Sequence, residues 1–144
     1  AITEFQVREV IAAGQRAAAE TPVFSFRLGE PGVFPEQGAA RVVWLGLSQG
    51  AQGMQALQVN LAGRLRAAGL TLEARAFTPH LTLGRVKSGA DTVRGSWLAN
   101  SGTGTSWKKL EAVAGEIRVM QSHLQPGGAR HTLLAACPLN GKLT

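Results

Sequence analysis

Apolar and polar residues follow two different rhythms at the start of the chain, which predict a helix and then a strand. Over residues 3–19 the apolar residues recur at helical spacing, with Thr3 as the N-cap and Gln6 completing a capping box. Residues 22–28 alternate between apolar and polar positions, which is typical of a half-buried strand. The sequence Gly29-Glu-Pro-Gly32 predicts a turn directly after this strand.

The middle of the chain predicts a strand, a helix and a second strand. Residues 41–47 are almost continuously apolar, as in a buried strand. From Met54 an apolar stripe at helical spacing runs to Gly69, the expected C-terminal cap. Residues 79–86 form the next predicted strand. The glycine- and serine-rich residues 88–105 predict a loop or an inserted excursion, with a helical portion around residues 93–98.

The last part of the chain predicts a β-hairpin. A strand lies within residues 109–121, and its pairing portion is expected at residues 115–123. Pro126-Gly127-Gly128 predicts a tight turn, and residues 130–137 predict the final strand. One domain with helices and largely antiparallel strands, an α+β fold, is the expected architecture for these 144 residues.

The charge balance changes this picture by indicating a kind of partner. Lys and Arg number 15 against 9 acidic residues, which gives a net charge of +6. Such a balance favours an anionic partner such as nucleic acid or phosphate. The basic residues are mostly Arg, whose planar guanidinium suits phosphate oxygens. A basic surface with no specific partner is the alternative.

The single cysteine, Cys137, lies in an apolar run and is expected to be buried. It cannot form an internal disulfide, and a site with several cysteine ligands is excluded, so a reducing cytoplasm fits best. No run of about 20 apolar residues occurs, and residues 1–20 lack the features of a signal peptide. We therefore expect a cytoplasmic protein that is not anchored in a membrane.

The predicted strand around His80 is the segment most suited to chemistry. Alternate side chains of a strand share a face, so His80 and Thr82 point one way, while Leu81 and Leu83 are expected to point into the core. An imidazole and a hydroxyl about 7 Å apart can hold one phosphate. The imidazole can move protons near neutral pH, and Arg85 adds positive charge. The same spacing also fits a solvent-facing strand without catalytic function.

The residues in and around this strand resemble a known family. Phe77-Thr-Pro-His-Leu-Thr-Leu-Gly-Arg85 is similar to the second signature of the 2H phosphoesterases, specifically the RNA 2',3'-cyclic phosphodiesterases, also called 2'-5' RNA ligases. Other blocks resemble this family in the expected order: Gly32-Val-Phe-Pro35, Arg41-Val-Val-Trp-Leu-Gly46, Ser122, Pro126-Gly127-Gly128 and Thr132-Leu133. His131 departs from the pattern, because it stands where the family usually has Tyr.

The resemblance implies a fold and a reaction. The fold would have two lobes, with antiparallel sheets lining a central groove and helices outside. Two histidines facing each other would hydrolyse RNA 2',3'-cyclic phosphate ends to a 2'-phosphate, with ligation as the reverse direction. His80 would be the general base, with the acid role as the alternative, while Thr82 and Arg85 bind phosphate. No metal or other cofactor is implied, and RNA ends or cyclic nucleotides would be bound by a monomer.

One departure from the family bears directly on activity. The family uses two His-x-Thr-x motifs, and this sequence contains one, at His80-Leu-Thr-Leu83. The resemblance implies an N-terminal segment, with its strands and the first motif, that is absent from this sequence. We expect the 144 residues alone to hydrolyse cyclic phosphates poorly or not at all.

Four further residues are candidates for lining the groove: Phe77, Phe34, Ser122 and His131. Core packing is the favoured alternative for Phe77, core or turn packing for Phe34, and a structural role for Ser122. His131, like His123, also fits a partly exposed strand position. Trp97 and Trp107 could stack on bases, but simple packing is favoured for both.

Two other functions remain open at this point. The chain could be a non-catalytic module that binds RNA ends or nucleotides through His80 and Thr82. It could also belong to a 2H phosphoesterase that acts on ADP-ribose cyclic phosphate or a related nucleotide.

Overall fold

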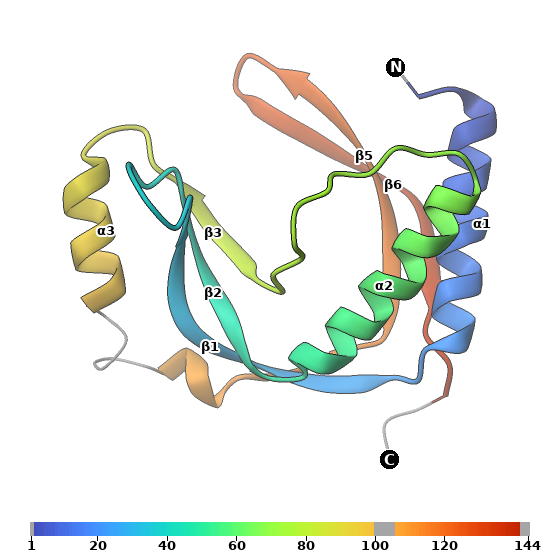
Figure 1. Cartoon of the computed structure of the whole chain (residues 1–144), viewed down its shortest axis with the longest axis horizontal. Coiled ribbons are helices and arrows are strands. Elements are labelled where there is room, and N and C mark those ends of the chain that lie inside the picture. Colours follow the sequence, from blue (N-terminus) through green and yellow to red (C-terminus); the bar gives the residue numbers. More distant parts are fainter. Residues whose placement is uncertain (1, 100–105, 142–144) are drawn as a thin grey trace. The chain divides into compact units, whose positions relative to one another are not determined.

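A computed structural model gives the fold of the chain and describes residues 2–99 and 106–141 (Figure 1). The described residues form three α-helices, a short 3₁₀ helix at Ser106–Lys109 and six strands, so the predicted α+β class is confirmed. The helices are α1 (Glu4–Glu20), α2 (Ala51–Ala67) and α3 (Ala90–Ala99). The strands are β1 (Phe24–Phe34), β2 (Val42–Gln49), β3 (Leu81–Arg85), β4 (Glu111–Ala114), β5 (Glu116–Gln125) and β6 (Gly128–Pro138).

The strands form two sheets. One has four strands in the order β3-β2-β1-β4, and β1–β2 and β2–β3 are antiparallel pairs. The other is the antiparallel hairpin of β5 and β6. Pairing of Gln125 with Gly128 leaves Pro126 and Gly127 as its turn, which confirms the predicted hairpin.

The chain divides into two compact units, and each is described by itself. Unit 1 comprises Ala1–Phe24, Ala56–Ala76 and Val113–Thr144. Unit 2 comprises Ser25–Gln55 and Phe77–Ala112.

Unit 1 packs α1 against the β5–β6 hairpin. Thr3 caps α1, and the predicted capping box with Gln6 is present, with both reciprocal hydrogen bonds formed. The core is built from small residues around the fully buried Cys137. A Cβ placed on Gly14 of α1 would lie 3.3 Å from the Cys137 sulfur, so this glycine lets the helix approach the hairpin closely.

Polar contacts join α1 to α2 within unit 1. Arg64 lies 2.5 Å from one carboxylate oxygen of Glu20, and the Asn60 amide donates a 3.0 Å hydrogen bond to the other. The hydrogen bond from Arg64 lowers the pKa of the Glu20 carboxyl, and Asn60 adds to this effect. Beyond the helix, Gly69 has a φ of 84° and its N–H donates to the carbonyl of Arg66, which confirms the predicted cap.

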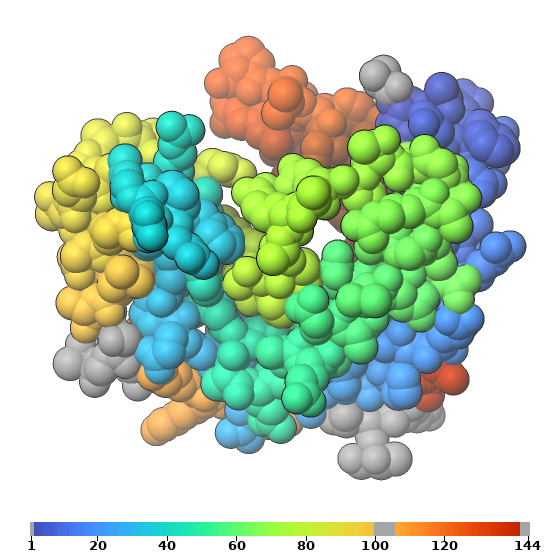
Figure 2. All heavy atoms as spheres, viewed as in Figure 1, coloured from blue at the N-terminus to red at the C-terminus, as the bar shows by residue number. Residues whose placement is uncertain are grey.

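In unit 2, side chains of α3 bond to β1, to β2 and to the connection between them. The Arg94 guanidinium donates hydrogen bonds of 2.6–3.1 Å to the carbonyls of Pro35, Glu36 and Gly38. Figure 2 shows α3 (yellow) beside this connection between β1 and β2 (cyan). The helix predicted around residues 93–98 is thus confirmed as the longer α3, and residues 100–105 of the predicted loop lie outside the described residues.

The turn predicted at Gly29-Glu-Pro-Gly32 is wrong, because β1 continues through it. Leu28 pairs with Leu47 and Pro31 with Leu45, so the strand absorbs one extra residue instead of reversing. A Cβ on Gly29 would lie 2.7 Å from the backbone nitrogen of Ser48. The glycine therefore serves a close approach of two strands.

The strand predicted within residues 109–121 is two strands that belong to different sheets. β4 and β5 are interrupted at Gly115, whose carbonyl accepts a 2.8 Å hydrogen bond from the Leu139 N–H. None of the helices in the described ranges combines the length and apolarity needed to cross a lipid bilayer.

Candidate active site

The pairing of β3 with β2 decides which way the candidate residues point. Thr82 lies opposite Trp44, and Leu81 lies opposite Leu45. Residues opposite one another in a sheet share a face, so Thr82 is on the Trp44 face. His80 immediately precedes β3, and its ring lies 5.7 Å from that of Trp44. The structure therefore brings His80 and Thr82 to one face, as the sequence predicts.

Arg85 reaches the same face through an irregularity in β3. In a regular strand, residues 82 and 85 would point to opposite faces, because they are an odd number of positions apart. The register shifts between Val43 and Trp44: Val43 pairs with Gly84, and Trp44 with Thr82, which leaves Leu83 without a partner. Arg85 is consequently opposite Val42, two positions from Trp44, and thus on the Trp44 face.

The His80 ring has a defined hydrogen bond. Its Nδ1 lies 2.6 Å from the carbonyl oxygen of Thr78. A carbonyl can only accept, so Nδ1 carries the proton and donates. The neutral ring then has its lone pair on Nε2, the nitrogen that can act as a base.

Two aromatic side chains lie against the same ring. The Phe34 ring centroid is 5.0 Å from that of His80 in an edge-on arrangement, and 4.8 Å from that of Trp44. Phe34 therefore packs on a neighbour, as favoured, and also contacts the candidate base. Such aromatic pairs each contribute about 0.5–1.5 kcal/mol beyond the area they bury.

Trp44 was not among the residues singled out from the sequence, and its position depends on a glycine. It pairs with Gly32, and a Cβ on that glycine would lie 2.2 Å from two atoms of the indole ring. The carbonyls of Gly32 and Trp44 both accept from Nε1 of Trp97, at 2.9 and 3.3 Å. The sequence offers one hint of this arrangement. Trp44 ends the block Arg41-Val-Val-Trp44, and the block Gly32-Val-Phe-Pro35 lies at the end of the strand before it.

The leucines next to the candidate residues are not in a core, which corrects the sequence prediction. Leu81 is 46% exposed and Leu83 is 51% exposed. The physical reason is that β3 is an edge strand with one neighbour, and the register shift at Leu83 breaks the alternation on which the prediction rested.

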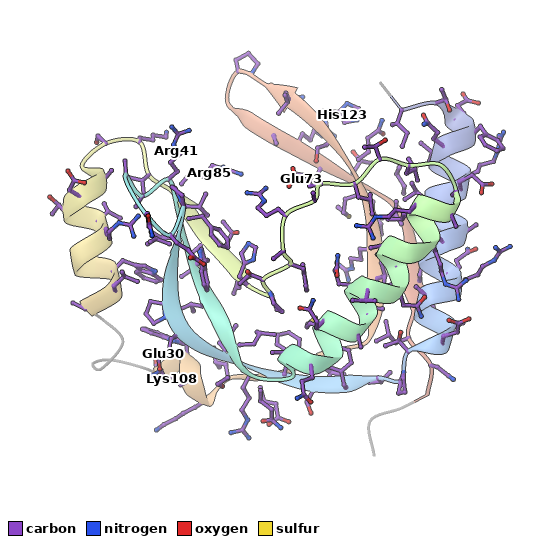
Figure 3. The ribbon with its side chains drawn as sticks, in the orientation of Figure 1. Glu30, Arg41, Glu73, Arg85, Lys108 and His123 are labelled. Atoms are coloured by element: carbon purple, nitrogen blue, oxygen red, sulfur yellow. The ribbon has the colours of Figure 1, made fainter. Side chains whose placement is uncertain are left out.

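Positive charge gathers at one end of β2 and β3. Arg41 directly precedes β2 and Arg85 ends β3, and Figure 3 shows both at this end of the sheet. The Val86 N–H donates to the Arg41 carbonyl at 2.9 Å, which ties the two segments together. Both guanidinium groups are exposed, and within the described ranges neither has a hydrogen-bond or ion-pair partner.

The remaining candidates divide between the two units. In unit 1, Ser122 and His131 face each other across the hairpin, with the serine Oγ 2.9 Å from Nδ1 of the imidazole. In unit 2, Phe77 is 39% exposed, so its favoured core packing is wrong. His123 is exposed on the hairpin, as expected.

The other two tryptophans, Trp97 and Trp107, pack against the protein, as favoured from the sequence. Trp97 is half-buried and bonds to the carbonyls described above. Nε1 of Trp107, also half-buried, donates a 3.1 Å hydrogen bond to the carbonyl of Gly29. Neither ring is therefore a freely exposed platform for a base.

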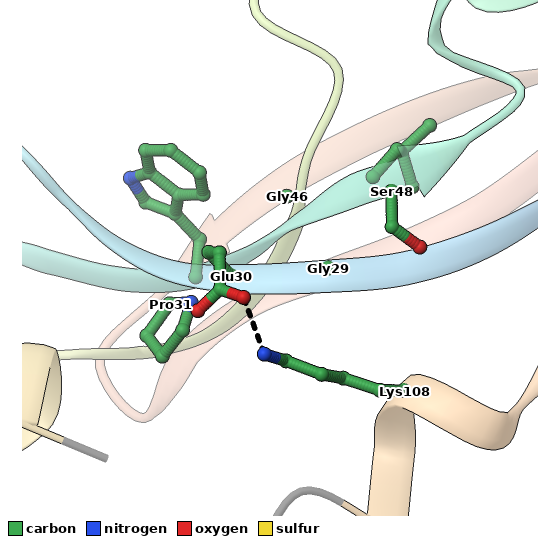
Figure 4. Close-up of a pocket in the computed structure, with 8 residues that line it drawn as sticks. Gly29, Glu30, Pro31, Gly46, Ser48 and Lys108 are labelled. Carbon is green, nitrogen blue, oxygen red and sulfur yellow. Dashed lines mark hydrogen bonds and ion pairs between the residues drawn. The ribbon is translucent and has the colours of Figure 1, made fainter. Parts of the chain in front are cut away.

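A shallow pocket of about 250 Å³ also lies in unit 2, at the irregular part of β1 (Figure 4). An ion pair between Glu30 and Lys108 borders it. Its lining residues are Gly29, Glu30, Pro31, Trp44, Gly46, Leu47, Ser48 and Lys108. His80 and Thr82 are not among them, and Trp44 is the residue that this lining shares with the face of the candidate residues.

Residues 3–125 match the model of a family described as the 2'-5' RNA ligase superfamily. The chain therefore belongs to this superfamily, a group of 2H phosphoesterases, which confirms the resemblance. The match includes the complete segment from Phe77 to Arg85.

Curated relatives carry a more specific name. The chain is 36% identical over 89 residues to an RNA 2',3'-cyclic phosphodiesterase of Aquifex aeolicus, covering 60% of this chain and 47% of the relative. It is 28% identical over 131 residues to an RNA 2',3'-cyclic phosphodiesterase of Thermotoga maritima, covering 85% of this chain and 62% of the relative. The chain thus spans about half to three-fifths of these relatives' length.

Solved structures share the fold. The protein TT0787 of Thermus thermophilus matches with a TM-score of 0.65 and 25% identity over 99% of this chain and 75% of its own. E. coli LigT in its apo form matches with a TM-score of 0.70 and 25% identity, covering 97% of this chain and 71% of its own. LigT complexed with 3'-AMP matches with a TM-score of 0.71 and 23% identity, covering 97% of this chain and 72% of its own.

Proposed function

We propose that the protein to which this chain belongs hydrolyses RNA 2',3'-cyclic phosphate ends to 2'-phosphates, with His80 as the general base. The observation that carries the proposal is the shared face of His80, Thr82 and Arg85, which the register shift in β3 makes possible. Membership of the superfamily and the name of the curated relatives support it.

The chemistry follows from the protonation of His80. Nδ1 donates to the Thr78 carbonyl, so the lone pair of Nε2 takes a proton from the attacking water. The water oxygen forms a bond to phosphorus, and the bond from phosphorus to the ribose O3' breaks. A second histidine, from a second His-x-Thr-x motif, would protonate the departing O3'. This step leaves the 2'-phosphate and uses no metal.

Phosphate binding would be the task of two exposed groups. The Thr82 hydroxyl would donate to a non-bridging oxygen, and the Arg85 guanidinium would offset the charge that builds up on phosphorus. Both groups lie on the face of Trp44, and within the described part of the chain neither is engaged by another side chain. Arg41, at the same end of the sheet, adds positive charge.

The direction and setting of the reaction are part of the same proposal. Attack by a ribose 5'-hydroxyl of a second RNA end in place of water, with the same departure of O3', would instead form a 2'-5' linkage. The complexes of E. coli LigT with 3'-AMP and with phosphate are in line with a site for nucleotides and their phosphates. We propose a monomer that acts in the cytoplasm on RNA ends or on cyclic nucleotides.

Substitution of His80 tests the role of this residue. In the protein that contains this chain, His80→Ala should lower the rate of hydrolysis of a 2',3'-cyclic-phosphate RNA oligomer. The expected loss is about 10²–10⁴-fold, because a positioned proton acceptor is removed. Circular dichroism should stay unchanged, since His80 is exposed. The matched control is His123→Ala, an exposed histidine on the hairpin, which should retain activity. Near-native turnover by His80→Ala would refute the assignment.

A binding module is the second candidate, favoured by the presence of one His-x-Thr-x motif in the 144 residues. On this alternative the chain binds RNA ends through His80 and Thr82 without hydrolysing them. Isothermal titration of the chain with 2'-AMP, alongside an assay for cyclic phosphate hydrolysis, separates the two. Binding without turnover by the complete protein would favour the module, and turnover would exclude it.

A further inference from the structure

The His80 ring is exposed, yet more than one group limits its orientation. Its hydrogen bond to Thr78 spans two positions of an exposed segment, so on its own this bond would leave the side chain free to rotate. The rings of Phe34 and Trp44 lie 5.0 and 5.7 Å from it and occupy space into which it would otherwise turn. Three contacts together therefore select one rotamer and one protonated nitrogen.

The position of the Trp44 ring is itself fixed by Gly32 and Trp97. The indole occupies the space that a side chain at Gly32 would fill, since a Cβ there would lie 2.2 Å from two ring atoms. Trp97 fixes the strand pair beneath it by donating to the carbonyls of Gly32 and Trp44. The support thus runs from α3 through the sheet to the indole and on to His80.

The indole of Trp44 has a buried N–H group that costs free energy, which simple packing does not explain. Within the described residues, Nε1 of Trp44 is buried without a hydrogen-bond partner. A buried donor without an acceptor is unfavourable, and a Phe or Leu at this position would avoid it. Retention of the indole is accounted for if its large ring is needed against His80.

We propose that Trp44, with Phe34, is a positioning residue that holds His80 in the tautomer with Nδ1–H and a basic Nε2. Neither ring touches the reacting atoms in this assignment. The inference rests on the proposed function only for its effect on rate, because the tautomer itself can be observed without any substrate.

The experiment measures the ring nitrogens of His80 by ¹⁵N NMR of the 144-residue chain. The chain has 3 histidines, so His123→Gln and His131→Gln assign the signals. The unaltered chain should show His80 as a single Nδ1–H tautomer when neutral. Trp44→Leu and Phe34→Leu should each give averaged shifts typical of two tautomers, and Trp44→Phe, whose ring is smaller than the indole, should give a smaller change in the same direction.

Glycine variants provide a matched pair. Gly32→Ala displaces the indole and should change the His80 shifts as Trp44→Leu does, whereas Gly95→Ala on α3, whose Cβ would meet no atom within 4 Å, should leave them unchanged. A single Nδ1–H tautomer in folded Trp44→Leu would overturn the proposal. An Nε2–H tautomer in the unaltered chain would also overturn it. This measurement needs no variant, so it tests the proposal even if every variant fails to fold.

Kinetics separate this inference from the proposed function. In the complete protein, Trp44→Leu should lower kcat by about 10–100-fold with little change in KM, because misplacing a catalytic group by about 1 Å can cost about 100-fold. An inactive unaltered protein would refute the proposed function while leaving the NMR result standing. An unchanged kcat in Trp44→Leu would overturn the positioning role while leaving the function intact.

Discussion

The His80 ring lies against two aromatic side chains that are distant in sequence, Phe34 and Trp44. The spacing of His80 and Thr82 predicted that they share a face, and the register shift in β3 brings Arg85 to the same face. That spacing could not predict Trp44, because the close approach of an indole to Gly32 arises only when β1 pairs with β2. The shared face of His80 and Thr82 was thus predictable from the sequence, and the aromatic side chain beside them was not.

Cys137 illustrates a residue whose behaviour was predictable from its surroundings in sequence. It is fully buried, as expected, and burial raises the pKa of its thiol, with a smaller contribution from Glu116. Because the folded pKa is raised, the contribution of this group to stability is full below the ordinary thiol pKa. That contribution is lost as the pH rises through the alkaline range.

The reactivity of this thiol gives a prediction at the residue scale. In the native chain Cys137 should react with Ellman's reagent at least about 100-fold more slowly than in concentrated urea, because reaction requires local opening and a thiolate. Stopped-flow absorbance measures both rates, and Cys137→Ser, which has no thiol, gives the blank. Equal rates with and without urea would show that the sulfur is accessible.

The strand β3 lies within its predicted bounds, but its register differs from that of a regular strand. A strand was expected at residues 79–86, and one is present at Leu81–Arg85. Periodicity finds such elements because apolar residues must face a core. It cannot find an extra residue that is absorbed in a strand, because the register depends on the partner strand. The irregularities at Leu83 and in β1 were both missed for this reason.

The register of β3 can be tested with paired cysteines. Val42 and Arg85 are opposite one another, so Val42→Cys combined with Arg85→Cys should form a disulfide on mild oxidation. Arg41→Cys combined with Arg85→Cys is the matched control, because a regular strand would place those two residues opposite instead. Non-reducing mass spectrometry identifies the linked peptides. Preferential linkage of the control pair would refute the shift at Leu83.

Two glycines in helices offer a second test at this scale. A Cβ on Gly63 of α2 would meet no atom within 4 Å, so Gly63→Ala should raise the free energy of unfolding by about 0.5–1 kcal/mol. Gly14→Ala gains the same helix propensity but crowds the Cys137 sulfur at 3.3 Å, so its effect should be smaller or reversed. Urea titration measures both, and an equal gain in both variants would contradict the close packing of α1.

For the whole molecule, the net charge of +6 predicts how binding responds to salt. Between 50 and 200 mM NaCl, affinity for a short single-stranded RNA should fall by about 2–3-fold for each phosphate that the protein neutralises. Fluorescence anisotropy at several salt concentrations gives the slope. Arg85→Ala should make the slope shallower, and an affinity independent of salt would argue against phosphate contacts.

The division into two units has a practical consequence for spectroscopy. All three tryptophans, Trp44, Trp97 and Trp107, lie in unit 2, and the sequence contains no tyrosine. Intrinsic fluorescence is therefore an optical reporter of unit 2 alone, while far-UV ellipticity averages over both units. If the two signals give the same denaturation midpoint, the units unfold as one cooperative system. If the midpoints differ, the fluorescence curve belongs to the unit that carries His80.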